Sequence, residues 1–199
     1  MTNRQKRGIA LIVAGVIMIL CAVGMHRMEQ KQDELTGENS RVLLNQLHRE
    51  KISIQLPDEP DQPESQTEPT EMPVEEILGY DLIGTIRVPE VGLELPVQYG
   101  WSKELLNVAP CRYSGSLSDS DLILMGHNYR SQFYSLLQAE QGMVVEFVEL
   151  NGEIHRYTVS ETLTLRGSEG ELLPSDYPLT LFTCTPGGQS RFVVRCGSE

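Results

Sequence analysis

Hydrophobic residues are concentrated in two parts of the chain, separated by a long polar stretch. The first part, residues 8–25 (GIALIVAGVIMILCAVGM), carries no charged side chain. As a helix it would be about 27 Å long at ~1.5 Å per residue, close to the hydrocarbon thickness of a bilayer. Arg4, Lys6 and Arg7 precede it, which favours a cytoplasmic basic tail over residues 1–7. The pattern predicts a transmembrane signal anchor over residues 8–25.

A cleaved signal peptide is the alternative, because Ala22-Val23-Gly24 resembles a cleavage site made of small residues. The apolar run is longer than the core of a usual signal peptide, so an uncleaved anchor is favoured. We therefore expect a single-pass protein of the cell membrane, with its folded part outside the cell.

The polar stretch divides into two segments. Residues 26–55 are typical of a polar helical stalk, whose only apolar stripe is made of Val42, Leu43, Leu44 and Leu47. This stripe either pairs with a partner helix or belongs to a solvated spacer, and the spacer is favoured because a coiled coil needs several heptads. Residues 56–75 are acidic and rich in proline, which predicts a disordered tether.

Residues 76–199 form the second apolar part and alternate between short β-rich runs and turn residues. Asn151-Gly152 between two such runs predicts a hairpin, and Ser102 is a candidate N-cap of a brief helix. A second short helix is expected to end at Gly142. Seven or eight short, mostly antiparallel strands with two small helices indicate a closed β-barrel or a sandwich.

Composition excludes several kinds of function. The net charge of −12 argues against a nucleic-acid partner, which requires a basic face. The four cysteines and four histidines show neither CxxC nor zinc-ligand spacing, and there is no glycine-rich phosphate loop. We therefore expect no metal and no cofactor.

One predicted hairpin brings a thiol and a guanidinium together. If its turn is centred on Gly187-Gly188, Cys184 lies opposite Arg191, and Thr180 lies opposite Arg195. Opposite residues of an antiparallel pair project from the same face, with Cβ atoms ~4.5–5.5 Å apart. The pattern therefore places Arg191 beside the sulfur and Arg195 further along the strand.

These residue types suit attack on a carbonyl group. A thiol becomes a strong nucleophile as a thiolate beside a cation or base, and a guanidinium can stabilise the oxyanion that forms. His127 follows a buried strand, and it could protonate a leaving amine. His155 lies within a hairpin and is expected to be solvated. Each residue alone has a structural explanation, but the three together favour catalysis.

Several separated segments carry a family resemblance. LTLFTC at residues 179–184, followed by the arginine of SRFVV, resembles the TLxTC…R signature of the sortases. GHN at residues 126–128 resembles the sortase histidine motif, and RYSGS at residues 112–116 resembles the segment that precedes it. IGTIRVPEVGLELPV at residues 83–97 is similar to the opening strands of the family. The resemblance extends from Gly79 to the C-terminus.

The resemblance implies a closed eight-stranded sortase-type β-barrel with short helices, preceded by the transmembrane helix and stalk. It implies that Cys184 is the nucleophile, His127 the general acid/base and Arg191 the stabiliser of the transition state. Three further residues would support substrate or oxyanion: Thr183 beside the nucleophile, the backbone N–H of Thr185, and Asn128 in the histidine loop.

The implied reaction is transpeptidation. The thiolate cleaves a sorting motif near the C-terminus of a surface protein, holds it as a thioester, and passes it to an amine of a peptidoglycan precursor or a pilin. Features of class B and of classes C and D are both present, and wall anchoring is slightly favoured over pilus assembly.

Two alternatives to this reaction remain: an exported cysteine peptidase, and a non-catalytic barrel that binds surface ligands. For Cys111 and Cys196, two separate buried thiols are favoured over a disulfide.

Overall fold

The computed structural model describes residues 3–54, 72–166, 173 and 176–198. The chain divides into two compact units, Met1–Leu35 and Thr36–Glu199. Helix α1 (Asn3–Ile54) begins in the first unit and ends in the second. From Ile12 this helix is long and apolar enough to cross a membrane, judged by length and composition, so it is a candidate transmembrane segment. The predicted tether, residues 56–75, lies almost wholly outside the described residues.

The second unit is mostly β structure. Its short helices are η1 (Pro89–Val91), α2 (Lys103–Leu106) and η2 (Phe133–Gln138). Its strands are β1 (Glu75–Ile77), β2 (Tyr80–Val88), β3 (Leu93–Gln98), β4 (Cys111–Ser114), β5 (Leu122–Met125), β6 (Val144–Glu149), β7 (Ile154–Arg166), β8 (Leu179–Cys184) and β9 (Ser190–Ser198).

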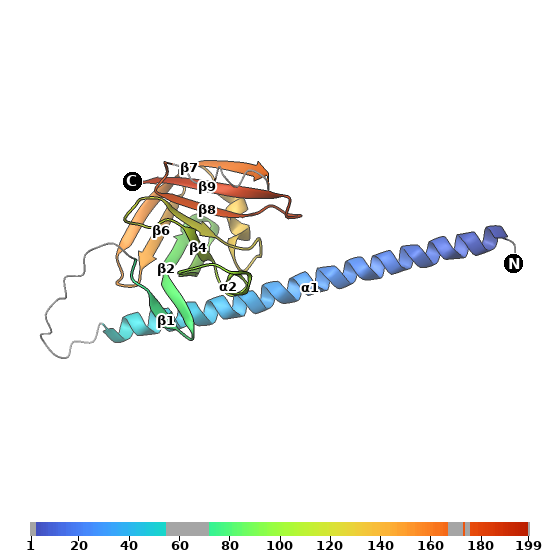
Figure 1. Ribbon diagram of the computed structural model, residues 1–199, viewed down its shortest axis with the longest axis horizontal. Coiled ribbons are helices and arrows are strands. Elements are labelled where there is room, and N and C mark those ends of the chain that lie inside the picture. Colours follow the sequence, from blue (N-terminus) through green and yellow to red (C-terminus); the bar gives the residue numbers. More distant parts are fainter. Residues whose placement is uncertain (1–2, 55–71, 167–172, 174–175, 199) are drawn as a thin grey trace, which may run out of the picture. The chain divides into compact units, whose positions relative to one another are not determined.

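The strands form one sheet that closes on itself. Their order is β1-β2-β3-β4-β5-β8-β9-β7-β6, and β2 also pairs with β6, so strands β2 to β9 make a closed barrel with β1 added at its edge. Strands β7, β9 and β8 lie side by side in Figure 1. Most pairs are antiparallel, as predicted, but β3–β4 and β5–β8 are parallel. The closed barrel is confirmed over the sandwich.

Local sequence signals account for several of the turns. Ser102 caps α2, because its side chain accepts a hydrogen bond from the Leu105 N–H at 3.1 Å. Gly152 has φ of 91°, a left-handed conformation that favours glycine, and it joins β6 to β7. Both the predicted helix start and the predicted hairpin are confirmed.

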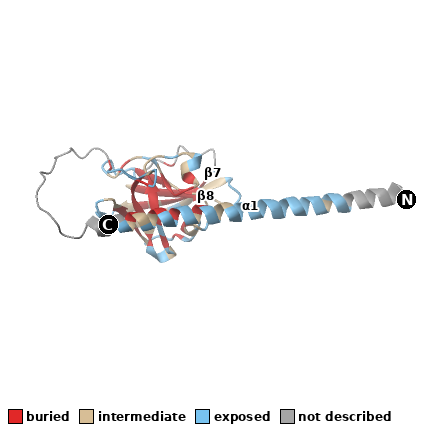
Figure 2. Ribbon diagram, turned by 90° about the horizontal axis from the view of Figure 1, so that it is seen from below, coloured by how far each residue is buried: buried red, intermediate tan, exposed pale blue. Residues whose placement is uncertain are grey.

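The barrel interior is filled by apolar side chains from strands β2, β3 and β5 to β9, and Figure 2 shows buried residues gathered there. Its largest fully buried members are Phe133 and Phe147. Cys111 and Cys196 are also buried, and both are free thiols, so the two-thiol interpretation is confirmed over the disulfide. Burial raises the pKa of each thiol to about 12.

Part of the predicted stalk belongs to the folded unit. Leu43 and Leu47 are each only 2% exposed, whereas Val42, the residue before Leu43, is 51% exposed. The two leucines pack in one apolar cluster with Ile77, Leu82, Val108 and Ala109. The solvated-spacer interpretation is therefore wrong for this part of α1, because its apolar stripe covers an apolar face of the barrel unit rather than facing water.

Candidate active site

Cys184 is the last residue of β8 and the first on that strand to be exposed. The five residues before it, Leu179–Thr183, are all buried. A rigid, buried strand therefore presents the thiol at its end. The register of β8 with β9 pairs Cys184 with Arg191 and Thr180 with Arg195, so the predicted hairpin register is confirmed.

The turn that follows Cys184 depends on two glycines. Gly187 and Gly188 have φ of 89° and 70°, in the left-handed region. The turn is closed by hydrogen bonds from the Thr185 N–H to the Ser190 carbonyl at 2.8 Å and from the Gly188 N–H to the Thr185 carbonyl at 2.8 Å. The Thr185 N–H is thus already used within the hairpin, and an oxyanion role would require it to share or break this bond.

The two arginines of β9 have different surroundings. Arg191 is half-buried, and β9 lies between β8 and β7, where Arg191 is paired with Leu165 on the β7 side. Arg195 donates to the Glu161 carboxylate at 2.9 Å, and its guanidinium lies 5.9 Å from the centre of the Tyr177 ring. Arg195 therefore belongs to an ion pair away from the thiol, and Arg191 is the arginine that pairs with Cys184.

His127 reaches the same end of the barrel through the parallel pairing of β5 with β8. Met125 pairs with Phe182, and the Gly126 N–H continues this pairing by donating to the Phe182 carbonyl at 3.2 Å. His127 follows β5 by two residues, and Cys184 lies two residues beyond Phe182 at the end of β8. Because β5 and β8 are neighbours that run in the same direction, both residues lie at the same end of the sheet.

Gly126 and Gln132 hold the backbone of His127. A Cβ on Gly126 would lie 2.6 Å from the ring of Phe133, so only glycine allows this loop to lie against the core. The His127 N–H donates to the side-chain oxygen of Gln132 at 2.7 Å, and the Gln132 amide donates to the Leu106 carbonyl at 2.8 Å. The buried Gln132 therefore joins the histidine loop to α2.

The imidazole is held by Asn107 and Tyr129. Nε2 lies 3.2 Å from the side-chain oxygen of Asn107, and the Tyr129 ring stacks at 4.6 Å between centroids. Because the amide oxygen can only accept, this contact suits the neutral imidazole that carries its proton on Nε2 and has Nδ1 unprotonated. Burial lowers the pKa of His127 below its ordinary value of 6.5, which favours that neutral form.

Unlike the exposed Cys184, Thr183 and Asn128 each carry a buried side-chain oxygen. Thr183 is 1% exposed, and its hydroxyl oxygen has no hydrogen-bond partner among the described residues. The side-chain oxygen of Asn128 is likewise buried without a partner in the described part of the chain. The hydrogen bond to the imidazole comes instead from Asn107, which the sequence analysis did not single out.

The face that carries Cys184 continues into an aromatic surface. Phe182 meets Tyr113 edge-on at 5.3 Å between ring centroids, and Tyr113 lies 5.7 Å from Trp101. Trp101 and Tyr113 are exposed. A thiol, a guanidinium and a neutral imidazole thus lie at one barrel end, beside exposed aromatic rings suited to holding an extended substrate.

The family model of the Sortase domain matches residues 86–199, more than half of the chain. The chain belongs to the sortase family. No curated protein matches its sequence.

Solved structures of sortases share the fold. Sortase C1 from Streptococcus suis is 25% identical, with a TM-score of 0.52, and the match covers 59% of this chain and 73% of that one. Sortase C1 from Streptococcus agalactiae is 28% identical, with a TM-score of 0.52 and coverage of 58% and 66%. Sortase A from Listeria monocytogenes is 26% identical, with a TM-score of 0.53 and coverage of 59% and 87%.

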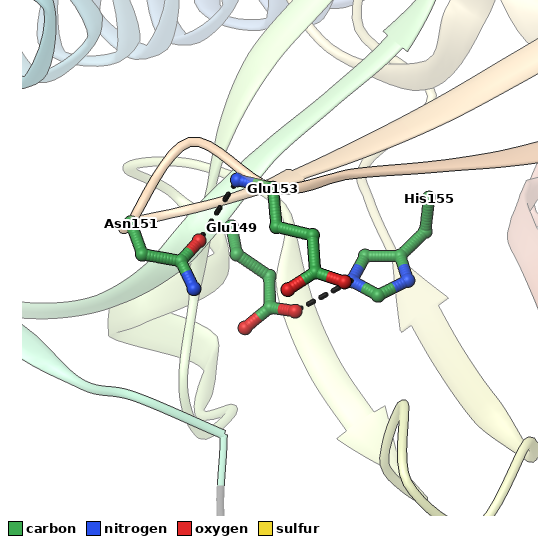
Figure 3. A network of polar contacts seen from close by, with 4 residues as sticks. All are labelled: Glu149, Asn151, Glu153 and His155. Carbon is green, nitrogen blue, oxygen red and sulfur yellow. Dashed lines mark hydrogen bonds and ion pairs between the residues drawn. The ribbon is translucent and has the colours of Figure 1, made fainter.

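A second polar cluster lies on the β6–β7 hairpin of this sortase. His155 Nε2 lies 2.5 Å from a carboxylate oxygen of Glu149 and 4.0 Å from one of Glu153, and Asn151 accepts from the Glu153 N–H (Figure 3). The ligand atoms of the two carboxylates and the imidazole lie within 4.8 Å of one another, a spacing at which a metal ion could be bound. The expectation that His155 is solvated is wrong, because it is half-buried and paired.

Proposed function

We propose that this protein is a membrane-anchored cysteine transpeptidase that acts on surface proteins outside the cell. It cleaves a sorting motif near the C-terminus of its substrate through a thioester and transfers the new carboxyl end to an amine. Family membership supports this class of reaction, and the apolar N-terminal helix supports the membrane anchor.

Catalysis begins at Cys184. The neutral Nδ1 of His127 takes the thiol proton, and the thiolate attacks the scissile carbonyl carbon to form a C–S bond. The guanidinium of Arg191 stabilises the oxyanion that develops. Collapse of the tetrahedral intermediate breaks the C–N bond as His127 returns its proton to the leaving nitrogen. The product is a thioester on Cys184 and a free amine.

The second half of the reaction resolves this thioester. An incoming primary amine attacks the thioester carbonyl while His127 accepts a proton from its nitrogen. Collapse then breaks the C–S bond, restores the Cys184 sulfur and leaves a new amide. The amine comes from a peptidoglycan precursor or from a pilin lysine.

A single observation carries the assignment of residues. Strand β8 carries Cys184 and pairs with two strands. Its antiparallel partner β9 pairs Arg191 with Cys184, and its parallel partner β5 leads to His127, so residues from distant parts of the sequence lie at one end of the sheet. A barrel that only binds ligands has no need for this combination of an exposed thiol, a cation and a neutral base.

The test uses the full chain in detergent micelles with a library of sorting-type peptides. Mass spectrometry should detect an acyl adduct on Cys184, and added hydroxylamine should release the peptide as a hydroxamate. Cys184→Ala is the matched control and should form no adduct. An adduct that yields only free acid with hydroxylamine present would indicate a peptidase, and the lack of any Cys184-dependent adduct would indicate a binding protein.

A further inference from the structure

The helix that contains the candidate membrane anchor contacts the part of the barrel unit that holds His127. Thr36, Ser40, Leu43 and Leu47 are spaced by three or four residues, so they lie on one face of α1, and all four are buried. Leu35 and Val42 on the same helix are exposed. One face of this segment is therefore built into the folded unit.

Two hydroxyl groups on that face donate hydrogen bonds to carbonyl groups just after the last residue of α2. Thr36 Oγ1 donates to the Asn107 carbonyl at 2.8 Å, and Ser40 Oγ donates to the Val108 carbonyl at 2.6 Å. The last carbonyls of a helix have no partner within that helix and need donors from elsewhere. The segment of α1 supplies those donors.

The turn that follows α2 also contacts His127. Asn107, whose carbonyl accepts from Thr36, presents its side-chain oxygen to His127 Nε2 at 3.2 Å. The neighbouring Leu106 carbonyl accepts from Gln132, whose side-chain oxygen holds the His127 N–H. The end of α2 thus lies between α1 and the catalytic imidazole.

A glycine on α1 brings the helix against the histidine loop directly. A Cβ on Gly37 would lie 2.8 Å from the Cβ of Ser131, the residue before Gln132. Glycine inside a helix is unfavourable relative to alanine, so close approach explains its presence at this position. Both the end of α2 and the loop after His127 are therefore in contact with one face of α1.

We infer that the segment Thr36–Leu47 of α1 is a positioning element for catalysis, which acts through Asn107 to hold the imidazole of His127 in its reactive orientation and tautomer. This inference rests on the proposed function, in which His127 moves the proton. Thr36 and Ser40 touch neither substrate nor reacting atoms, so their effect passes through the end of α2. A sortase released from this segment would keep its thiol and its arginine but lose control of its base.

The experiment compares variants of the full chain in detergent micelles. Thr36→Val removes a hydroxyl with almost no change in shape, and the double variant Thr36→Val/Ser40→Ala removes both donors while leaving Leu43 and Leu47 in place. Thr36→Ser keeps the donor, and Val42→Ala changes an exposed position of the same helix. Thermal unfolding of each variant verifies that the barrel is folded.

Two readouts are measured. The first is turnover, where the double variant should lower kcat roughly 3- to 10-fold with KM unchanged, a fraction of the total effect of a general acid/base. The second is the ¹⁵N spectrum of the labelled histidines, with His127 assigned by His127→Gln, where the double variant should lose the Nε2-protonated signature. Thr36→Ser and Val42→Ala should match the wild type in both.

The outcomes separate the inference from the proposed function. If the wild type transfers peptide and the double variant matches it in kcat and in the His127 spectrum, the positioning role is wrong while the proposed function stands. If the wild type transfers nothing but the spectrum changes as expected, the proposed function is wrong while α1 still controls the imidazole.

Discussion

Arg191 lies directly opposite Cys184 across the β8–β9 hairpin. The other arginine of the strand, Arg195, is bound to Glu161 by an ion pair. Two arginines four positions apart on one strand thus have different neighbours. This difference makes them a matched pair for mutation.

We expect Arg191→Ala to lower kcat/KM for peptide transfer by about 10²-fold or more, because the oxyanion loses its cation. Arg195→Ala should lower it less than about threefold, since a partly exposed ion pair contributes little. Initial rates of transfer by the two variants decide the point. A larger loss with Arg195→Ala would mean that Arg195, and not Arg191, stabilises the oxyanion.

Gly126→Ala should damage both stability and activity. The added methyl group would lie 2.6 Å from the buried Phe133 ring, so the loop or the ring must shift, at a cost of about 1–3 kcal/mol. Urea denaturation and kcat are the measurements. Gly100→Ala is the control, because a Cβ there meets nothing within 4 Å. Equal behaviour of the two variants would show that Gly126 is not under packing constraint.

Alkylation should distinguish the cysteines of the folded unit. Cys184 is exposed, whereas Cys111 and Cys196 are buried, with pKa values raised to about 12. Iodoacetamide at mildly alkaline pH should therefore label Cys184 in the native protein and leave the other two unmodified until urea is added. Peptide mapping by mass spectrometry reads out the sites, and native labelling of Cys111 would contradict the structure.

The pKa of His127 predicts a dependence of stability on pH. Burial lowers this pKa in the folded state below the ordinary value of 6.5, so the unfolded chain binds the proton more readily. The contribution of His127 to stability is present above pH 6.5 and is lost as pH falls through the folded-state pKa.

Urea midpoints measured at about pH 8 and about pH 5 test this relation. The wild type should lose more stability between the two than His127→Gln, which has no proton to gain. Identical losses would mean that the imidazole is not buried as described.

The buried face of α1 makes a prediction about the limits of the folded unit. Leu43→Ala or Leu47→Ala should lower the free energy of unfolding by about 2–4 kcal/mol, whereas Val42→Ala should change it by less than about 0.5 kcal/mol. A fragment that begins at Val74 should melt below one that begins at Thr36, because it exposes Leu82 and Val108. Equal melting temperatures would contradict the packing of α1.

Much of the barrel could be predicted because its signals are local. The Asn151-Gly152 turn, the Ser102 cap and the register of the Cys184 hairpin each depend on residues close together in sequence. The resemblance to sortases added the expectation that Cys184 and His127, which are far apart in the sequence, belong to one site.

The contacts that hold the imidazole could not be predicted in the same way. Asn107 and Gln132 reach His127 only because α2 and the loop after β5 meet in space. The stripe on α1 was visible in the sequence, but a stripe of four apolar residues does not identify the surface that it covers.

The crossover between β5 and β8 has a consequence for biosynthesis. The pairing of Met125 with Phe182 forms only after η2, β6 and β7 have been made and the chain has returned to the sheet. Such long-range pairing is slow, since the loop must close before the contact is gained. His127 is therefore made well before Cys184, and the two are brought to one end of the sheet only when β8 is added beside β5.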